Sequence, residues 1–406
     1  MREINIFTYS FPYGNSEQFL YEELLVLSKT FDKINIFPAL FSNKTIAWDL
    51  PKNIFIYHFE NKNESSSKNK NIGLLAKAFV SEWKHGTHFK KYLSKIRYYV
   101  AHLSNANTQA EKLFAFLKES KINTDSVFYT YWFDDWTYKL AILKEKKQIK
   151  RLVTRAHGGD VYEYQHAEKG FFFPFRNFQI QQIDKIFPIS QDGLEHLKKL
   201  YPLSNPKLKL SRLGTKDRGL NPFKENKDEF VLLSCSTFYH YKNVGLVPKI
   251  LVLLKFPVKW IHIGNDGPEK EQVINSLKTL PSNIKTEFKG HLSQEEIFSF
   301  YKNNPIDLFI NVSKSEGLPV SLMEAISFGI PIMAPNVGGI KEITNEKTGV
   351  LYDIPTTPEK LAEIITSIYT GQILIKRNEV RKFWEENFMG EKNFSTFSNE
   401  LNLITK

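Results

Sequence analysis

The stretch IDLFINV (residues 306–312), followed two residues later by SEGLPVSLMEA (residues 315–325), decides the fold class of this chain. The first segment is a short apolar run typical of a buried strand, and the second places a Gly/Pro turn before a helix. Pro319 fits the first position of that helix, where a missing N–H costs nothing. The order of strand, glycine turn and helix predicts an α/β sheet with a ligand beyond the carboxyl ends of its strands.

Two glutamates flank the start of this helix, Glu316 in the turn and Glu324 within the first two helical turns. Free backbone N–H groups and the helix dipole favour an anion there, such as a diphosphate. Because glutamate pairs are common on solvated helix faces, the prediction of a binding site depends on the Gly/Pro turn between these two glutamates. We expect Glu324 to accept hydrogen bonds from ribose hydroxyls and Glu316 from a second set of hydroxyls. The predicted binding residues are Glu316, Gly317, Leu318, Pro319, Val320 and Glu324.

This stretch, with FGIP (328–331) and NVGGIKE (336–342) after it, resembles the donor-site signature of family 4 glycosyltransferases, which are of the group 1 type. The resemblance covers nearly the whole chain and is firmest over residues 229–352. It implies the GT-B fold, in which two Rossmann-like, doubly wound parallel-sheet domains face a central cleft. The strand and helix patterns predict doubly wound sheets independently of that resemblance.

At 406 residues the chain exceeds what one core normally supports, so two domains are expected. We predict an N-terminal acceptor-side domain over residues 1–213 and a C-terminal nucleotide-sugar-binding domain over residues 214–385. A final helix, about 386–406, is expected to return to the first domain. The predicted strands are 4–9, 33–38, 54–59, 126–133, 152–157, 185–190 and 207–211, then 230–235, 260–264, 285–288, 308–312, 331–334 and 350–352.

Composition and charge limit the possible partners. One cysteine excludes an internal disulfide and a cysteine-based metal cluster, and no apolar run is long enough to span a membrane. Lys and Arg number 31 against 21 Asp and Glu in residues 1–210, and 24 against 23 in the remainder. The densest basic segment, residues 83–99, also carries aromatics, so it is either an interfacial helix for anionic lipid or a solvated helix face. We expect a cytoplasmic protein that binds no nucleic acid. The interfacial alternative would place it on the inner face of the cytoplasmic membrane.

Loops that follow predicted strands of the second domain contain further candidates. Lys242 is expected to open the helix after strand 230–235, where a cation suits a diphosphate leaving group. The family has a Gly-Arg-Leu segment with a lysine five positions after the arginine. Lys242 matches that lysine, whereas Ser236 holds the glycine position and Thr237 the arginine position. Gly290 and His291 lie where the family packs the nucleotide base.

The first domain contains two candidates. Gly14, in the loop after the opening strand, resembles the family's glycine loop near the donor phosphates, although an ordinary strand-to-helix turn explains it equally well. His157, at a strand end before two glycines and Asp160, matches the family's His-Gly-x-Asp segment. The resemblance assigns His157 a hydrogen bond to the donor sugar or its transition state. For Asp160 the local interpretation is a cap of the segment that follows.

The sequence contains no Asp-x-Asp, His-Glu-x-x-His, Gly-x-Ser-x-Gly or Walker motif, so we expect no metal site and no bound cofactor. The resemblance implies a retaining, metal-independent transfer from a nucleoside-diphosphate sugar, with a UDP-sugar as the first expectation. The acceptor would be a glycan or lipid-linked sugar in bacterial surface polysaccharide assembly, with His157, Lys242 and Glu316 as catalytic residues. Two alternatives stay open: a catalytically degenerate binding protein, which Thr237 favours, and a GT-B sugar-nucleotide epimerase.

Overall fold

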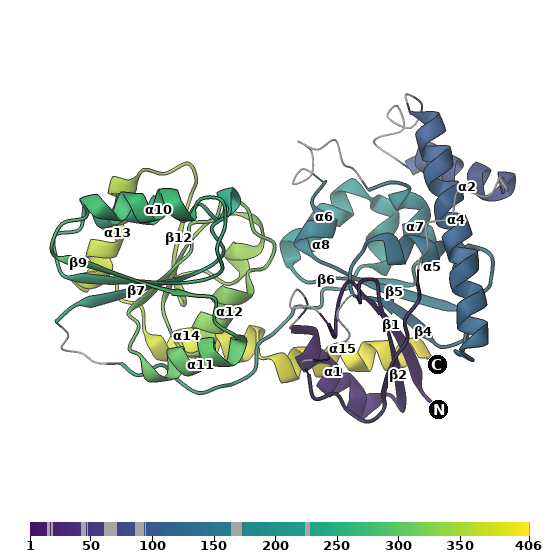
Figure 1. Cartoon of the computed structure of the whole chain (residues 1–406), viewed down its shortest axis with the longest axis horizontal. Coiled ribbons are helices and arrows are strands. Elements are labelled where there is room, and N and C mark those ends of the chain that lie inside the picture. Colours follow the sequence, from purple (N-terminus) through teal and green to yellow (C-terminus); the bar gives the residue numbers. More distant parts are fainter. Residues whose placement is uncertain are drawn as a thin grey trace. The chain divides into compact units, whose positions relative to one another are not determined.

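The computed structural model describes residues 1–13, 17, 19–41, 46, 48–60, 71–85, 93, 95–163, 173–223 and 228–405. The chain divides into two compact units, the first formed by residues 1–212 and 391–406 and the second by residues 213–390 (Figure 1). Residues 386–390, predicted to join the returning helix, stay with the second unit. Their backbone is tied there, because Thr215 N donates to Phe388 O at 3.0 Å and Gly390 N donates to Thr215 O at 2.9 Å.

The first unit contains a six-stranded parallel sheet in the order β3-β2-β1-β4-β5-β6. Alternate strand residues face opposite sides. Ile4 and Ile6 belong to one core with residues of α1 and α15, whereas Phe7 and Phe37 belong to another with residues of α4, α5 and α7. Figure 1 shows α1 and α15 on one side of this sheet. The strands are β1 (Glu3–Thr8), β2 (Lys33–Pro38), β3 (Ile54–Ile56), β4 (Val127–Thr130), β5 (Arg151–Ala156) and β6 (Lys185–Pro188).

Helices connect these strands. The described helices of the first unit are α1 (Phe19–Thr30), α2 (Ile72–His85), α4 (Ile96–Glu119), α5 (Asp135–Glu145), α6 (Gly158–Val161), α7 (Arg176–Gln182), α8 (Gln191–Leu200) and α15 (Gly390–Thr405). The strand predicted at 207–211 is wrong. A 3-10 helix occupies Pro202–Lys207, and Leu208 makes only an isolated bridge to Ile186, so this segment adds no strand to the sheet.

The second unit contains another six-stranded parallel sheet, in the order β12-β11-β10-β7-β8-β9. Its strands are β7 (Phe230–Cys235), β8 (Val258–Ile263), β9 (Ile284–Gly290), β10 (Leu308–Ile310), β11 (Ile332–Pro335) and β12 (Gly349–Tyr352). Its described α-helices are α9 (Leu246–Leu251), α10 (Lys270–Ser276), α11 (Gln294–Asn303), α12 (Val320–Ser327), α13 (Pro358–Tyr369) and α14 (Arg377–Asn387). Ser293 caps α11 in a capping box with Glu296, and Thr357 caps α13.

Both sheets are doubly wound, as predicted. In each, the first strand along the chain lies beside the fourth, so the connections on either side of that pair run outward in opposite directions. Ligands of open α/β sheets bind at this switch point, beyond the carboxyl ends of the two strands. The loops to examine therefore follow β1 and β4 in the first unit and β7 and β10 in the second. No helix within the described residues is long and apolar enough to cross a membrane.

Candidate functional site

The two loops at the switch point of the second unit meet through an ion pair. Lys242, in the loop after β7, places its Nζ 2.6 Å from Oε1 of Glu316, in the loop after β10. The side chains are 21% and 10% exposed, so water screens this pair only partly. Two residues singled out separately in the sequence are thus in direct contact at the point where a ligand is expected.

Lys242 does not open an α-helix, contrary to the prediction. It ends the 3-10 turn His240–Lys242, and α9 begins only at Leu246. Asn243 has a φ of 53°, in the left-handed region, so the backbone cannot continue as a helix directly after the lysine. The cation therefore comes from a tight turn, and the helix that faces the switch point is α12.

The turn before α12 is held by the two glycines predicted to accompany it. A Cβ on Gly338 would lie 1.9 Å from the carbonyl oxygen of Glu316, and Gly338 has a φ of +51°. Gly339 N donates to Gly317 O at 2.7 Å. Pro319 is the N-cap of α12 rather than its first residue, a shift of one position, and its φ of −71° fits either place. Leu318 and Pro319 are buried, whereas Gly317 and Val320 are partly exposed.

Glu324 lies inside the protein, in the middle of α12. Its side chain is 6% exposed, and Oε1 accepts a hydrogen bond from Gln294 Nε2 at 3.0 Å. Burial raises the pKa of Glu324 to about 7, against the opposing effect of the Gln294 hydrogen bond. Its charge therefore changes near neutral pH. Gln294 was not predicted as a site residue, although it is the first residue of α11 and lies within the capping box formed by Ser293 and Glu296.

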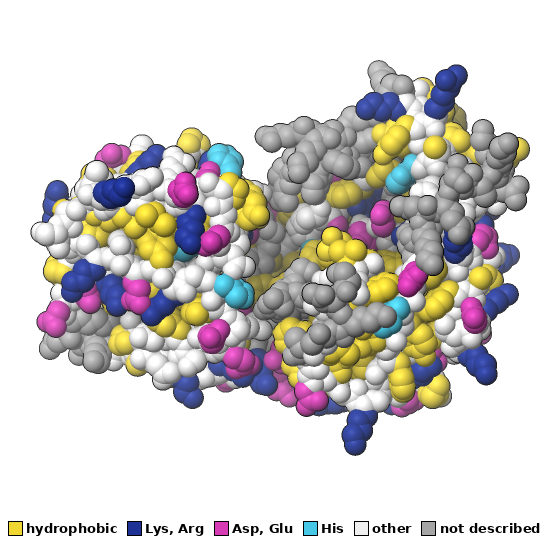
Figure 2. All heavy atoms as spheres, viewed as in Figure 1, with side chains coloured by type: hydrophobic (Ala, Val, Ile, Leu, Met, Phe, Trp, Pro, Cys, Tyr) yellow, Lys and Arg dark blue, Asp and Glu magenta, His cyan; other side chains and the backbone are white. Residues whose placement is uncertain are grey.

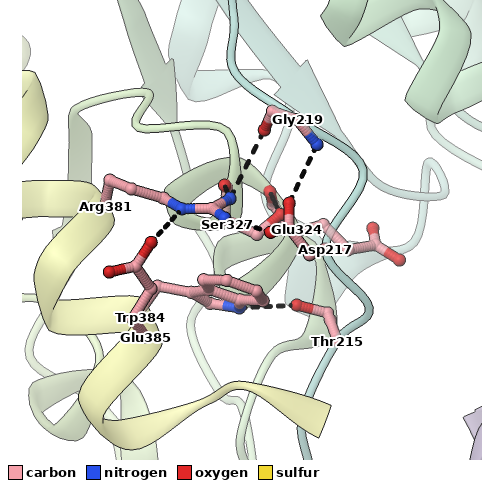
Figure 3. Close-up of polar contacts among 8 residues, drawn as sticks. All are labelled: Thr215, Asp217, Gly219, Glu324, Ser327, Arg381, Trp384 and Glu385. Carbon is pink, nitrogen blue, oxygen red and sulfur yellow. Dashed lines mark hydrogen bonds and ion pairs between the residues drawn. The ribbon is translucent and has the colours of Figure 1, made fainter. Parts of the chain in front are cut away.

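The far end of α12 is anchored by α14 (Figure 3). Ser327 Oγ donates to the carbonyl oxygen of Glu324 at 2.6 Å, and the Arg381 guanidinium donates to the carbonyl oxygen of Ser327. Arg381 also reaches Asp217 Oδ2 at 2.5 Å and Glu385 Oε1 at 2.8 Å. A cation at a helix C-terminus complements the helix dipole. These contacts fix the position of α12 and therefore the position of Glu324.

The remaining candidates of the second unit lie at neighbouring strand ends. Ser236 and Thr237 directly follow β7, are half-buried, and lead into the loop that carries Lys242. Gly290 ends β9 with a φ of +68°, and His291 follows it as an exposed residue. Because β8 separates β7 from β9, Gly290 and His291 lie two strands away from the Lys242 loop.

In the first unit, His157 follows β5 and is 5% exposed. Its ring lies 4.8 Å from the Tyr131 ring and 4.3 Å from the Trp132 ring, between centroids. Burial, and then the positive charge of Arg155, lower the pKa of His157 to about 3. Its Nε2 has no hydrogen-bond partner among the described residues. Asp160 acts as a cap, because its Oδ1 accepts from His157 N at 2.6 Å.

Glu17 was not predicted as a candidate, yet it contacts the loops after both β1 and β4. It is fully buried, and its carboxylate accepts hydrogen bonds from the backbone N–H groups of residues 9, 10 and 11 at 2.7–2.9 Å. It also accepts one from Trp132 Nε1 at 2.7 Å, which links the loops after β1 and β4. No local pattern distinguishes Glu17 from an ordinary surface carboxylate. Gly14, predicted in the same loop, lies outside the described residues.

The second unit therefore presents one half-buried cation, a carboxylate paired with it, a helix N-terminus and a buried carboxyl that titrates near neutrality. Such a set can bind an anionic group and hydroxyls together. Within the described residues, no three His, Cys, Asp or Glu side chains form a group that could hold a metal ion. Two doubly wound parallel sheets, the second of which carries this site, are the arrangement that defines the GT-B glycosyltransferase fold.

Comparison with known proteins shows which family the second unit is similar to. Residues 216–387, all in the second unit, match the family model described as glycosyl transferases group 1. A Bacillus subtilis protein named for teichuronic acid biosynthesis, TuaC, is 23% identical over 66% of this chain and 67% of its own length. The Arabidopsis thaliana sulfoquinovosyl transferase SQD2 is 33% identical over 36% of this chain and 30% of its own length.

Solved structures share the fold over nearly the full length. The lipopolysaccharide outer core galactosyltransferase WaaB superposes with a TM-score of 0.67 at 16% identity, covering 98% of this chain and 99% of WaaB. Anabaena HepE in complex with UDP gives a TM-score of 0.66 at 13% identity, covering 99% of this chain and 100% of HepE. At these identities the likeness establishes the GT-B fold alone.

Proposed function

We propose that this chain transfers a sugar, with retention of anomeric configuration, from a nucleoside-diphosphate sugar to a glycan or lipid-linked acceptor in bacterial surface polysaccharide assembly. The observation that carries the proposal is the contact between Lys242 and Glu316 at the switch point, beside the start of α12. Two relatives are named for teichuronic acid and O-antigen biosynthesis, which supports the acceptor class. HepE was solved with UDP, which supports a UDP-sugar donor.

Each candidate site residue of the second unit then has a role in the reaction. Lys242 and the free N–H groups of α12 stabilise the negative charge that grows on the diphosphate as it leaves. Glu316 accepts hydrogen bonds from hydroxyls of the transferred sugar, and Glu324 from ribose. The backbone after β9, at Gly290 and His291, packs the base. The transfer is proposed to need no metal, because these groups neutralise the leaving group.

The proton balance of a retaining transfer needs no protein base. The acceptor hydroxyl attacks the anomeric carbon on the face from which the diphosphate departs, and a phosphate oxygen takes the hydroxyl proton. His157, whose pKa is lowered to about 3 by burial and by Arg155, is neutral at pH 7. It would therefore act as a neutral hydrogen-bonding group toward the donor sugar rather than as a general acid.

A turnover experiment tests this proposal. The chain is incubated with UDP-, GDP-, ADP- or dTDP-sugars and lipid-linked acceptors in EDTA, and the anomeric configuration of the product is read by NMR. We expect transfer with one donor, retention, and loss of activity on Lys242→Ala but not on the exposed α9 variant Lys249→Ala. An inverted product, or transfer only with added metal, would contradict the mechanism.

A protein that binds donor without turnover is the second candidate, and Thr237 favours it because the family's arginine is missing there. The variant Thr237→Arg separates the two. If the parent is a working enzyme, the added cation should tighten donor binding without being needed for transfer. If the parent binds donor but produces neither transfer nor hydrolysis, and Thr237→Arg restores turnover, the chain is a degenerate family member.

The peripheral membrane location remains a proposal, and α2 supports it. The helix buries Leu74 and Ala78 on one face, yet it also exposes an apolar stripe at helical spacing. In that stripe, Ile72 is 77%, Val80 44% and Trp83 64% exposed. An apolar stripe that the protein does not cover, with basic residues beside it, suits an anionic lipid surface.

The start of α4 likewise exposes apolar side chains beside basic ones. Ile96 is 41% and Tyr98 59% exposed, and Lys95 and Arg97 alternate with them. Figure 2 shows hydrophobic side chains beside Lys and Arg near this end of α4. Residues 86–92 and 94, in the middle of the basic segment 83–99, lie outside the described residues.

Vesicle flotation tests the location. Vesicles containing about a third phosphatidylserine should carry the parent protein upward, and Trp83→Ser with Tyr98→Ser should reduce the bound fraction. Lys95→Glu with Arg97→Glu should do the same at low salt. The control is Leu374→Ser, which alters an apolar side chain that is 75% exposed in the second unit. Equal flotation of all variants would contradict the proposal.

A further inference from the structure

The loop between β7 and α9 exposes two tyrosines at the carboxyl end of the second sheet. Tyr239 is 46% and Tyr241 49% exposed. Their ring centroids lie 6.0 Å apart with an interplanar angle of 23°, which is an offset stacked arrangement. These two neighbouring, half-exposed rings are here called the tyrosine pair, and they lie next to the lysine of the candidate donor site.

Contacts with neighbouring segments hold the backbone of the tyrosine pair in place. Phe238, immediately before it, is buried and packs on the His262 ring at 4.6 Å between centroids. Glu269 N donates to the Phe238 carbonyl oxygen at 3.1 Å, and Lys314 N donates to the Tyr241 carbonyl oxygen at 2.8 Å. Two other loops thus clamp the tyrosine loop, which limits the entropy lost when a ligand binds.

Polar groups of both signs surround the two rings. His240, between the tyrosines, lies with Nδ1 3.1 Å from Glu269 Oε1, and its Nε2 is 3.1 Å from Lys314 Nζ. Lys242 Nζ lies 5.4 Å from the Tyr241 ring centroid. The surroundings therefore combine hydrogen-bond donors, acceptors and half-exposed aromatic faces, without the wide apolar surface that a protein interface core would need.

A pyranose is the ligand class that this chemistry fits. Its C–H faces are apolar and can lie on an aromatic ring, while its hydroxyls reach donors and acceptors at the ring edge. The Lys242–Glu316 pair, proposed above to hold the donor, adjoins the tyrosine pair through Lys242. A sugar on the tyrosine pair would therefore lie next to the donor rather than within its phosphate contacts.

We propose that Tyr239 and Tyr241 form a binding subsite for a sugar ring of the acceptor glycan. This inference rests on the proposed function only in naming the acceptor as the source of that sugar. Each ring should contribute about three- to tenfold in affinity for the sugar. Phenylalanine keeps the ring face, so Tyr→Phe changes should retain most of that affinity, whereas Tyr→Ala changes should lose it.

Saturation-transfer NMR measures the subsite directly, without turnover. The full chain is titrated with a panel of octyl hexopyranosides, and the signals of the sugar ring protons are followed. We expect saturation of the C–H face of at least one glycoside, lost in the double variant Tyr239→Ala with Tyr241→Ala and kept in the double phenylalanine variant. The control is Tyr369→Ala, because Tyr369 is 47% exposed but stacks on Phe256 and contacts Phe230 edge-on at the amino end of β7.

A parallel UDP titration separates failure of this inference from failure of the proposed function. The alanine variant should bind UDP as tightly as the parent. If it loses UDP affinity instead, the tyrosine pair contacts the donor and the acceptor subsite is refuted. If no glycoside is saturated, or if saturation persists in the alanine variant, the subsite is likewise refuted, whether or not the enzyme transfers sugar. Saturation that depends on the tyrosines supports it even if no transfer is found.

Discussion

The ion pair at the switch point predicts that removing the charge of Glu316 tightens UDP binding. Lys242 Nζ is 2.6 Å from Glu316 Oε1, so a bound diphosphate must compete with that carboxylate for the ammonium. The change to make is Glu316→Gln, which keeps the shape of the side chain and removes its charge. We expect this variant to bind UDP more tightly than the parent, although the variant alters a predicted binding residue.

The magnitude follows from the geometry. Two unit charges at the observed distance attract by about 6 kcal/mol at an effective dielectric constant of about 20, before desolvation is counted. Partial burial and side-chain entropy offset most of this, which leaves a net coupling of about 1–2 kcal/mol. Releasing Lys242 should therefore tighten UDP binding about fivefold or more. Lys242→Met removes a charge-assisted contact and should weaken UDP binding about tenfold or more.

Isothermal titration with UDP and with the matching UDP-sugar, in EDTA, measures both effects. With the UDP-sugar, the gain in Glu316→Gln should shrink or reverse, because the sugar hydroxyls lose their acceptor. The control is Glu287→Gln, since Glu287 pairs with Lys259 at 2.9 Å on neighbouring strands β8 and β9. The reasoning is refuted if Glu316→Gln weakens UDP binding as much as Lys242→Met does.

Three further predictions concern the second unit. Burial raises the pKa of Glu324 from 4.5 to about 7, so its contribution to stability is complete below about pH 4.5 and is lost as the pH rises through about 7. Chemical denaturation at several pH values should show that the unfolding free energy of Glu324→Gln increases relative to that of the parent as the pH rises. The increase should reach up to about 3 kcal/mol. Gly338→Ala should cost about 2 kcal/mol or more and weaken UDP binding, whereas Gly371→Ala, at a φ of +76° with open space around it, should cost only about 1 kcal/mol in thermal unfolding. Arg381→Met should lower the unfolding free energy by about 2–4 kcal/mol, and an unchanged melting temperature would show that α12 does not need this anchor.

Much of the fold follows from local sequence. Buried strands are short apolar runs, and the capping box at Ser293 and the cap at Thr357 need only neighbouring residues, so these elements were predictable. Errors arose where apolar residues continue beyond a strand. The run 126–133 is strand only over Val127–Thr130, although Tyr131 and Phe133 beyond the strand are also buried.

The sequence by itself determined the class of fold, the glycine turn before α12 and the identity of most candidate binding residues, because each depends on a pattern within one loop. Only the tertiary structure decided which residues meet. Lys242 contacts Glu316 across 74 positions, Gln294 contacts Glu324 across 30, and Glu17 holds Trp132 across 115. The physical reason is that these contacts depend on strand order: β7 lies beside β10, and β1 beside β4, through long-range pairing that no local pattern records.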